Sequence, residues 1–174
     1  MAATTVTLDA LNRASREEFE QTLGDVFERS PWIAGRASEA RPFASVEALH
    51  AAMTDVVQRA SREEQLALLR AHPDLAGRLA RAGALSQASG AEQSSAGLDR
   101  LSDEEAERFG RLNAAYRETF GFPFIIAVRR YDKKGILAAF EARLGNTPAQ
   151  EMNGALAEVA EIARFRLATL VKER

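Results

Sequence analysis

Residues 121–130 read Gly-Phe-Pro-Phe-Ile-Ile-Ala-Val-Arg-Arg, and they follow a helical pattern that runs over 103–120. The glycine and the proline would end that helix, because glycine is favoured just past a helix and proline cannot continue one. The apolar run after Pro123 is too short for a further helix, although periodicity alone does not separate an extended segment from a buried helical one. We therefore predict an irregular apolar segment at 122–128 in an otherwise helical chain.

The rest of the chain carries clear signals for helix starts and ends. Ser15, Ser61 and Ser102 are each followed three residues later by Glu, the pattern of a capping box. Thr147-Pro148 places a proline at the first position of a final helix. Glycines that would end helices are Gly24, Gly83, Gly121 and Gly145. Together these signals predict helices at 9–23, 45–59, 62–71, 74–82, 103–120, 135–144 and 148–171.

The composition is that of one ordinary globular domain. The chain has 174 residues, of which 46% are hydrophobic and 28% charged, and this is enough for a single sizeable core. Its net charge is −2 without a basic block, which argues against nucleic acid and membrane surfaces as partners. No apolar run approaches the roughly 20 residues that span a bilayer. We expect an all-α, single-domain bundle of about seven to nine helices over residues 1–174.

The chain contains no cysteine. This excludes disulfides, thiolate nucleophiles and cysteine-ligated metal centres, and it fits a reducing compartment. Residues 1–9 have neither the positive start nor the apolar core of a secretory signal. The final Lys172-Glu173-Arg174 does not match the peroxisomal Ser-Lys-Leu signal. We therefore expect a cytoplasmic protein.

The two histidines of the chain stand in different contexts. His50 lies in a predicted helix beside Leu49 and Met53, which favours a partly buried histidine, and it has no second ligand at metal-binding spacing. His72 precedes Pro73, which places its imidazole at the break between two helices, near the start of the second. Such a histidine suits acid–base chemistry near neutral pH. A helix cap or a buried hydrogen-bonding role is the alternative.

Residues 86–97 are mostly small or polar and resist assignment to a helix. Within them, Ser89-Gly90-Ala91-Glu92-Gln93 matches a capping box, which favours a helix start. Its small neighbours would also let backbone N–H groups approach a ligand, and the Gln93 amide offers the donor and acceptor that a ureide edge requires. Two interpretations of this motif therefore remain, a helix cap and a ligand-binding loop.

The apolar segment at 122–128 and two arginines each have a structural and a functional interpretation. The apolar segment is either buried core or, if it is not helical, a source of backbone donors and acceptors for a flat heterocycle. Arg164 and Arg166 lie on the last predicted helix. They are either solvated or able to clamp a carboxylate.

Short motifs in a fixed order extend over nearly the whole chain. They are Ser30-Pro31-Trp32, Arg41-Pro42-Phe43, Ala71-His72-Pro73-Asp74-Leu75, Ser89-x-x-Glu92-Gln93, Ala96-Gly97-Leu98, Asn113-x-x-Tyr116, Phe120-Gly121-Phe122-Pro123-Phe124 and Arg166-Leu167. In this order they resemble the OHCU decarboxylase family, whose members act on 2-oxo-4-hydroxy-4-carboxy-5-ureidoimidazoline (OHCU), the last intermediate between urate and allantoin. The His-Pro-Asp-Leu, Ser-x-x-Glu-Gln and Phe-Gly-Phe-Pro-Phe motifs are each weak alone and are specific when they occur together.

The resemblance implies an all-α homodimer that works without a metal or an organic cofactor. It implies decarboxylation of a small ureidoimidazoline to (S)-allantoin, and a functional coupling to hydroxyisourate hydrolase. His72 would be the catalytic proton donor and Glu92 its acidic partner, with Arg166, or its neighbour Arg164, near the charge of the substrate. The residues that it implies around the substrate are Pro73, Ser89, Gly90, Ala91, Gln93, Phe124, Ile125, Ile126, Ala127 and Val128.

One position departs from the family pattern. This chain has Arg130-Tyr131 where the family commonly has glycine, which affects the loop that would line the substrate. Two other functions stay open. In a non-catalytic helical interaction module, His72 and Glu92 would be caps, and 122–128 would be core or partner surface. In a hydrolase or isomerase of a related ureide, the pocket would be kept but no CO₂ released.

Overall fold

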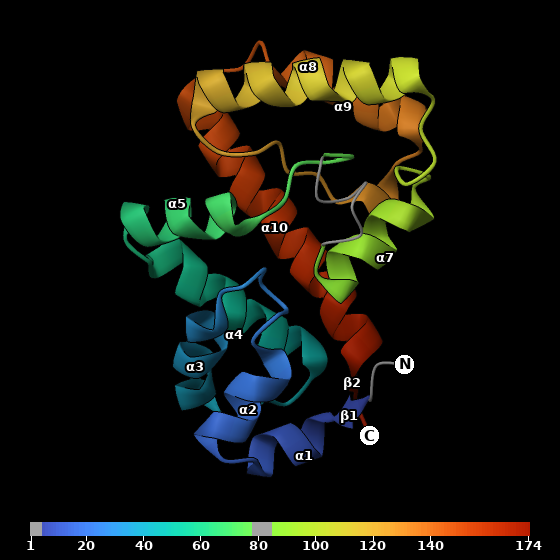
Figure 1. Cartoon of the computed structure of the whole chain (residues 1–174). Coiled ribbons are helices and arrows are strands. Elements are labelled where there is room, and N and C mark those ends of the chain that lie inside the picture. The colour runs from blue at the N-terminus through green and yellow to red at the C-terminus, as the bar shows by residue number, and fades with distance from the viewer. Residues whose placement is uncertain (1–4, 78–84) are drawn as a thin grey trace. The chain divides into compact units, whose positions relative to one another are not determined.

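The computed structural model describes residues 5–77 and 85–174. Within these ranges it has nine α-helices, two short 3-10 helices and one pair of two-residue strands, so the prediction of an all-α fold is confirmed (Figure 1). Contacts divide the chain into two compact units, one of Met1–Ala71 with Ala160–Arg174, and the other of His72–Val159. The expectation of one domain over 1–174 stays a prediction.

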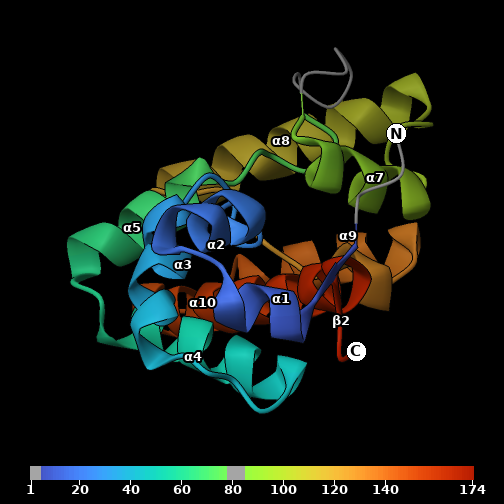
Figure 2. The same ribbon diagram turned by 90° about the horizontal axis from the view of Figure 1, so that it is seen from below.

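The first unit holds the amino-terminal helices and the end of the last helix. Its elements are β1 (Val6–Thr7), α1 (Leu8–Arg13), α2 (Arg16–Leu23), α3 (Pro31–Ala37), η1 (Ser38–Ala40), α4 (Val46–Arg59), α5 (Arg62–Ala71), the end of α10 (Pro148–Leu170) and β2 (Val171–Lys172). Helix α3 packs on both α2 and α4, and Figure 2 shows these three helices as neighbours. The two strands pair in parallel. Buried apolar side chains at the centre of this unit include Phe19, Leu23, Ile33, Leu49 and Met53.

The second unit is built around aromatic side chains. Its elements are α7 (Gln87–Ser95), α8 (Asp103–Phe120), η2 (Val128–Arg130), α9 (Lys133–Arg143) and the first part of α10. Helices α8 and α9 lie side by side (Figure 1). The Tyr116 ring of α8 is centred 4.6–6.0 Å from the rings of Phe120, Phe122, Phe124 and Phe140. Because aromatic rings bury large apolar areas, this cluster is the core of the unit.

The end of α8 is as the sequence predicts. Gly121 has a φ of 79° and donates its N–H to the Arg117 carbonyl, a left-handed conformation that glycine adopts at little cost. Residues 122–127 follow without helical structure, and η2 begins at Val128. The predicted irregular segment at 122–128 is therefore confirmed except for its last residue, which belongs to a 3-10 turn.

Helix starts that depend on local capping are confirmed. Ser15, Ser61 and Ser102 each form both hydrogen bonds of a capping box, and Thr147 exchanges the equivalent pair with Gln150. The helix ends are less regular. Gly24 ends α2 with a φ of −61° rather than a left-handed one. Among the described glycines, positive φ angles occur at Gly97 and Gly121, and Gly83 lies outside the described residues.

Three predicted boundaries are wrong. The helix expected at 9–23 is two helices, α1 and α2, because Ser15 caps the second one while Ala14 before it is extended. Helix α3 was not predicted, although proline at its first position is a helix-start signal. Helix α9 starts at Lys133 instead of 135, because Asp132 accepts a hydrogen bond from the Gly135 N–H.

Across residues 5–77 and 85–174, none of the helices combines the length and the apolar character that crossing a membrane requires.

Candidate active site

His72 directly follows α5 and opens a turn. Its side chain is buried, with 6% of its surface exposed, and residues 73–77 are not helical. Pro73 accounts for the end of α5, because a residue before proline is disfavoured in the helical conformation. The helix predicted at 74–82 is therefore wrong over 74–77, and residues 78–82 lie outside the described residues.

The Ser-x-x-Glu-Gln motif lies within α7, so the expectation that 86–97 is not helical is wrong. The N-cap is Ser86, whose hydroxyl accepts the Ser89 N–H; Ser89 itself stands one turn inside. The spacing of Ser89, Glu92 and Gln93 places them on one face of the helix, and all three are buried. Of the two small residues between them, Gly90 is half-buried, and Ala91 is exposed and faces away from this polar face.

One hydrogen bond joins the two motifs. The backbone N–H of Ala76 donates to Gln93 Oε1 at 2.9 Å, and both residues are buried. The bond holds the turn after His72 against the polar face of α7. The fold therefore brings the histidine motif and the glutamate motif, about twenty residues apart in sequence, into one neighbourhood.

Residues 124–128 form the third segment of the candidate site. Their side chains are buried, and η2, which begins at Val128, packs on α7. Several of their backbone groups are bonded within the protein. The Ala127 N–H donates to Glu158 Oε2 at 2.8 Å, and the Ile125 carbonyl accepts from Arg143 Nη1 at 2.7 Å. The carbonyls of Ala127 and Val128 accept the N–H groups of Arg130 and Tyr131. A bound heterocycle would have to use other backbone groups of this segment.

A buried network supports this segment from α9 and α10. Glu151 accepts hydrogen bonds from Arg143, Tyr116 and Asn146. Burial raises the pKa of the Glu151 carboxyl, but these hydrogen bonds outweigh it and hold the pKa below its usual range. Burial and the Glu151 carboxylate together raise the pKa of the Tyr116 phenol well above its usual range. Since Arg143 also bonds the Ile125 carbonyl, the network fixes the apolar segment in place.

The sequence did not single out this network, because Tyr116 lies 35 residues from Glu151 and the nearer members match no recognised motif. Tyr116 belongs to the Asn113-x-x-Tyr116 motif, the one signal that pointed to it. The partners Arg143 and Glu151 carry no local pattern that distinguishes them from surface charges.

His50 and the two arginines lie in the first unit. His50 is half-buried, which confirms the prediction, and its Nε2 lies 2.7 Å from the Ala160 carbonyl. Arg164 is exposed and pairs with Glu161 at 2.5 Å. Arg166 is 7% exposed and pairs with Glu28, also buried, at 2.9 Å. Burial thus distinguishes the two arginines, which the sequence alone did not do.

The second unit therefore gathers chemical groups suited to proton transfer. An imidazole, a carboxylate and an amide lie on two elements joined by a hydrogen bond, and their burial limits competing water. In the described ranges 5–77 and 85–174, no group of three or more His, Asp or Glu side chains is arranged to hold a metal ion.

The fold and the site together define a small all-α protein in which a buried histidine and a buried glutamate lie on segments that one hydrogen bond joins. Comparison with known families is more specific. The chain belongs to the OHCU decarboxylase family, whose model matches residues 12–168.

Relatives named for this activity are similar over nearly their whole length. The 2-oxo-4-hydroxy-4-carboxy-5-ureidoimidazoline decarboxylase of Haloferax volcanii is 48% identical over 163 residues, which is 94% of this chain and 95% of the relative. The protein of the same name from Amia calva is 43% identical and covers 93% of each chain. The uric acid degradation bifunctional protein PucL of Bacillus subtilis is 44% identical over 97% of this chain but only 33% of its own length.

Two solved structures have similar folds. A crystal structure of (S)-allantoin synthase superposes with a TM-score of 0.77 at 35% identity, covering 95% of this chain and 54% of that one. A crystal structure of an OHCU decarboxylase in the presence of (S)-allantoin gives a TM-score of 0.69 over 90% of this chain and 98% of that one. At 23% identity, the second similarity shows the fold alone.

Proposed function

We propose that this protein decarboxylates OHCU to (S)-allantoin. The observation that carries the proposal is the family match over residues 12–168, together with the burial of His72 and Glu92 on elements that one hydrogen bond joins. The substrate is then a small ureidoimidazoline, and the enzyme is a carboxy-lyase.

The substrate supplies its own electron sink. When the bond between the ring carbon and the carboxylate breaks, its electron pair passes to the adjacent ring C=N and CO₂ leaves. One proton is taken up overall: the ring nitrogen that receives the electron pair is protonated, and the hydroxyl left on the decarboxylated carbon, now an enol, becomes a carbonyl as a proton is added to the ring carbon that bears the ureido group. The protein has to orient the scissile bond, remove water from the carboxylate and deliver the proton to one face of the ring. Delivery to one face gives a single enantiomer.

His72 is the proposed proton donor. Its burial limits the water around the imidazole that could compete as a proton donor. Glu92, also buried, fixes the tautomer of the imidazole or the position of the substrate. The buried hydroxyl of Ser89 and the amide of Gln93 would bind the ureide. Pro73, Gly90, Phe124, Ile125, Ile126, Ala127 and Val128 complete the proposed substrate-binding set. Ala91 belongs to it through its backbone alone, because its side chain is exposed away from the polar face of α7.

Arg166 is the arginine that we propose for the charge of the substrate. It is buried, whereas Arg164 is exposed and already paired with Glu161. The buried carboxylate of Glu28 holds the guanidinium at 2.9 Å, so the side chain is oriented before any substrate arrives.

The first experiment compares wild type with His72→Ala. OHCU is generated from urate with urate oxidase and hydroxyisourate hydrolase, and the circular dichroism of the allantoin formed is followed over time. We expect rapid appearance of one enantiomer with wild type, and only slow racemic product with His72→Ala, whose far-ultraviolet spectrum stays helical.

The matched control is His50→Gln, which keeps a donor near the Ala160 carbonyl and leaves the other histidine unchanged. We expect wild-type turnover from it. Slow racemic product with wild type would refute the decarboxylase proposal and favour a helical interaction module. Turnover of the same ureide without CO₂ release would favour a hydrolase or isomerase.

We further propose that the protein is a cytoplasmic homodimer that is functionally coupled to hydroxyisourate hydrolase. The bifunctional uric acid degradation relatives, of which this chain matches about a third, support a coupling of consecutive steps. Sedimentation velocity of the purified chain tests the dimer; a single monomeric species would refute it.

A further inference from the structure

The peptide group between Leu75 and Ala76 is held at both edges by buried side-chain amides. Asn113 Nδ2 of α8 donates to the Leu75 carbonyl at 2.9 Å. On the opposite edge, the Ala76 N–H donates to Gln93 Oε1 of α7 at 2.9 Å. Carbonyl and N–H belong to the same planar unit, so two helices fix the orientation of one peptide plane three residues after His72.

Ala76 has a backbone conformation that requires such support. Its φ is 51°, in the left-handed region that a residue with a β-carbon disfavours. Conformations of this kind persist only where the surrounding structure holds them. The two hydrogen bonds to the side-chain amides of Asn113 and Gln93 restrain the peptide group that precedes Ala76. They therefore hold the turn in its observed conformation.

The buried side chain of Asn113 lowers the stability of the fold. It is 6% exposed, and its Oδ1 has no hydrogen-bond partner in the described part of the chain. A buried acceptor without a partner destabilises the fold, and an apolar side chain of the same size would avoid that loss. What an apolar side chain could not do is donate to the Leu75 carbonyl.

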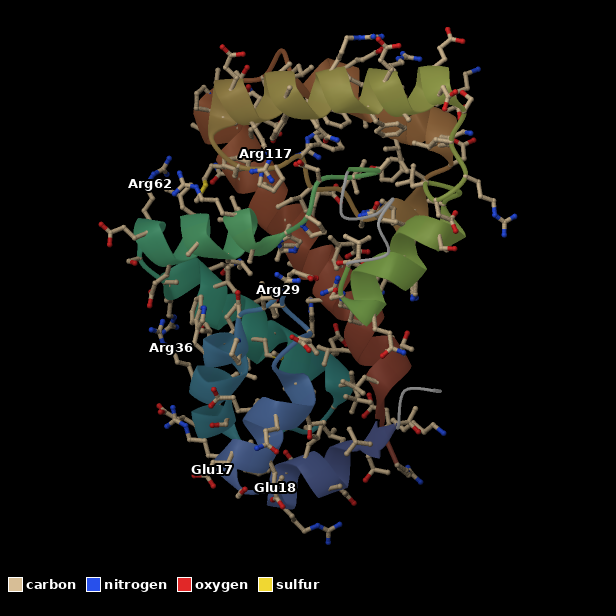
Figure 3. The ribbon with its side chains drawn as sticks, viewed as in Figure 1. Glu17, Glu18, Arg29, Arg36, Arg62 and Arg117 are labelled. Carbon is tan, nitrogen blue, oxygen red and sulfur yellow. The ribbon has the colours of Figure 1, made fainter. Side chains whose placement is uncertain are left out.

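A third contact extends the same restraint toward the histidine. Arg117 lies one helical turn after Asn113 on α8, and its Nε donates to Asp74 Oδ1 at 2.8 Å; Figure 3 shows its side chain reaching from the helix. Pro73 has its own φ fixed by its ring. The fixed φ of Pro73 and the restraint on Asp74 therefore reduce the freedom of the backbone between the held turn and His72.

We propose that Asn113 is a positioning residue for His72. By holding the Leu75–Ala76 peptide it keeps Ala76 left-handed, and through Pro73 it sets the direction of the imidazole. The kinetic part of this inference rests on the function proposed above, whereas the structural part does not.

The decisive variant is Asn113→Leu, which removes the donor and keeps the size of the side chain. We expect kcat to fall by about 10- to 100-fold, the scale at which misplacement of a reacting group acts, with KM changed much less. Adding Ala76→Gly removes the penalty of the left-handed conformation. The double variant Asn113→Leu/Ala76→Gly should therefore recover part of the lost kcat.

A readout that does not depend on turnover is the NMR signal of the imidazole carbon-bound proton. The chain has two histidines, so His50→Gln assigns both signals, and His50 serves as an internal reference. We expect the His72 signal to move in Asn113→Leu and to return toward its wild-type position in the double variant. Arg117→Leu removes the hydrogen bond to Asp74 and should also move the His72 signal. Because Arg117 is partly exposed, this variant still tests the proposal if Asn113→Leu does not fold.

The matched control for stability is Val57→Ala, a buried apolar truncation in α4 of the first unit. It should lower the melting temperature while leaving kcat and the His72 signal unchanged. Wild-type kcat with an unmoved His72 signal in Asn113→Leu and Arg117→Leu would overturn the proposal. If wild type itself does not decarboxylate OHCU, the proposed function fails, and the NMR comparison still decides the positioning role.

Discussion

At the scale of single residues, Glu151 is a buried carboxylate that joins three other side chains of the second unit by hydrogen bonds. Its side chain is 2% exposed and pairs with Arg143, itself 16% exposed, at 2.9 Å. Glu151→Gln keeps the shape but leaves the cation without its partner, and breaking a buried pair in this way costs about 3 kcal/mol or more. Urea unfolding followed by circular dichroism measures the loss.

The control is Glu141→Gln, which removes an ion pair with Arg108 in the same unit. Both of those side chains are about half exposed, and solvent-exposed pairs contribute at most about 1 kcal/mol. Equal losses in Glu141→Gln and Glu151→Gln would show that the Glu151 network does not stabilise the fold beyond an ordinary surface pair.

A comparison of the serine caps with Glu151 shows which residues can be predicted from the sequence. Ser15, Ser61 and Ser102 were recognised as caps because both partners of a capping box lie within four residues. Glu151 was not recognised, because its partner Tyr116 lies 35 residues away and only the fold brings them together. His72 and Glu92 were found through motif resemblance, which carries information that spacing alone does not.

At the scale of elements, α8 has one glycine inside it and another directly after its last residue, and the same substitution has opposite effects at the two positions. Gly121 ends the helix with a φ of 79°, so Gly121→Ala forces a β-carbon into the left-handed region and costs about 1 kcal/mol. Gly110 lies inside the helix, where an added β-carbon meets nothing within 4 Å, and Gly110→Ala stabilises by about 0.5–1 kcal/mol. Thermal unfolding of both variants tests the pair; shifts of the same sign would contradict it.

The elements that were predicted well are those with caps and a strong apolar face, such as α4, α5 and α8. Helix α7 was missed because its residues are small and polar and give little amphipathic pattern. The helix is held by tertiary contacts instead, among them the bond from Ala76 to Gln93. Hydrophobic periodicity detects a helix only when its buried face is apolar. The buried face of α7 is polar, because it consists of the proposed site residues Ser89, Glu92 and Gln93.

At the scale of the whole molecule, carboxylates that are hydrogen-bonded in the fold set its response to acid. The clearest is Glu64, where the hydrogen bond from Arg36 and then the backbone N–H of Ser61 lower the pKa from 4.5 to about 2. The pKa values of Glu18, Glu105 and Glu151 are also lowered. In the unfolded chain these groups titrate near their ordinary values.

A lowered folded-state pKa stabilises the fold above the unfolded value, and this stabilisation is lost as the pH falls through the folded value. For Glu64, this stabilisation is therefore lost as the pH falls from 4.5 to about 2. We expect the free energy of unfolding in urea to decrease below pH 4.5, and to decrease less steeply in Glu64→Gln, which cannot gain a proton there. Glu63→Gln, at the exposed position before it, should behave as wild type. An unchanged slope in Glu64→Gln would mean that the Arg36–Glu64 pair does not contribute to the acid response, and that the buried Glu151 carries more of it.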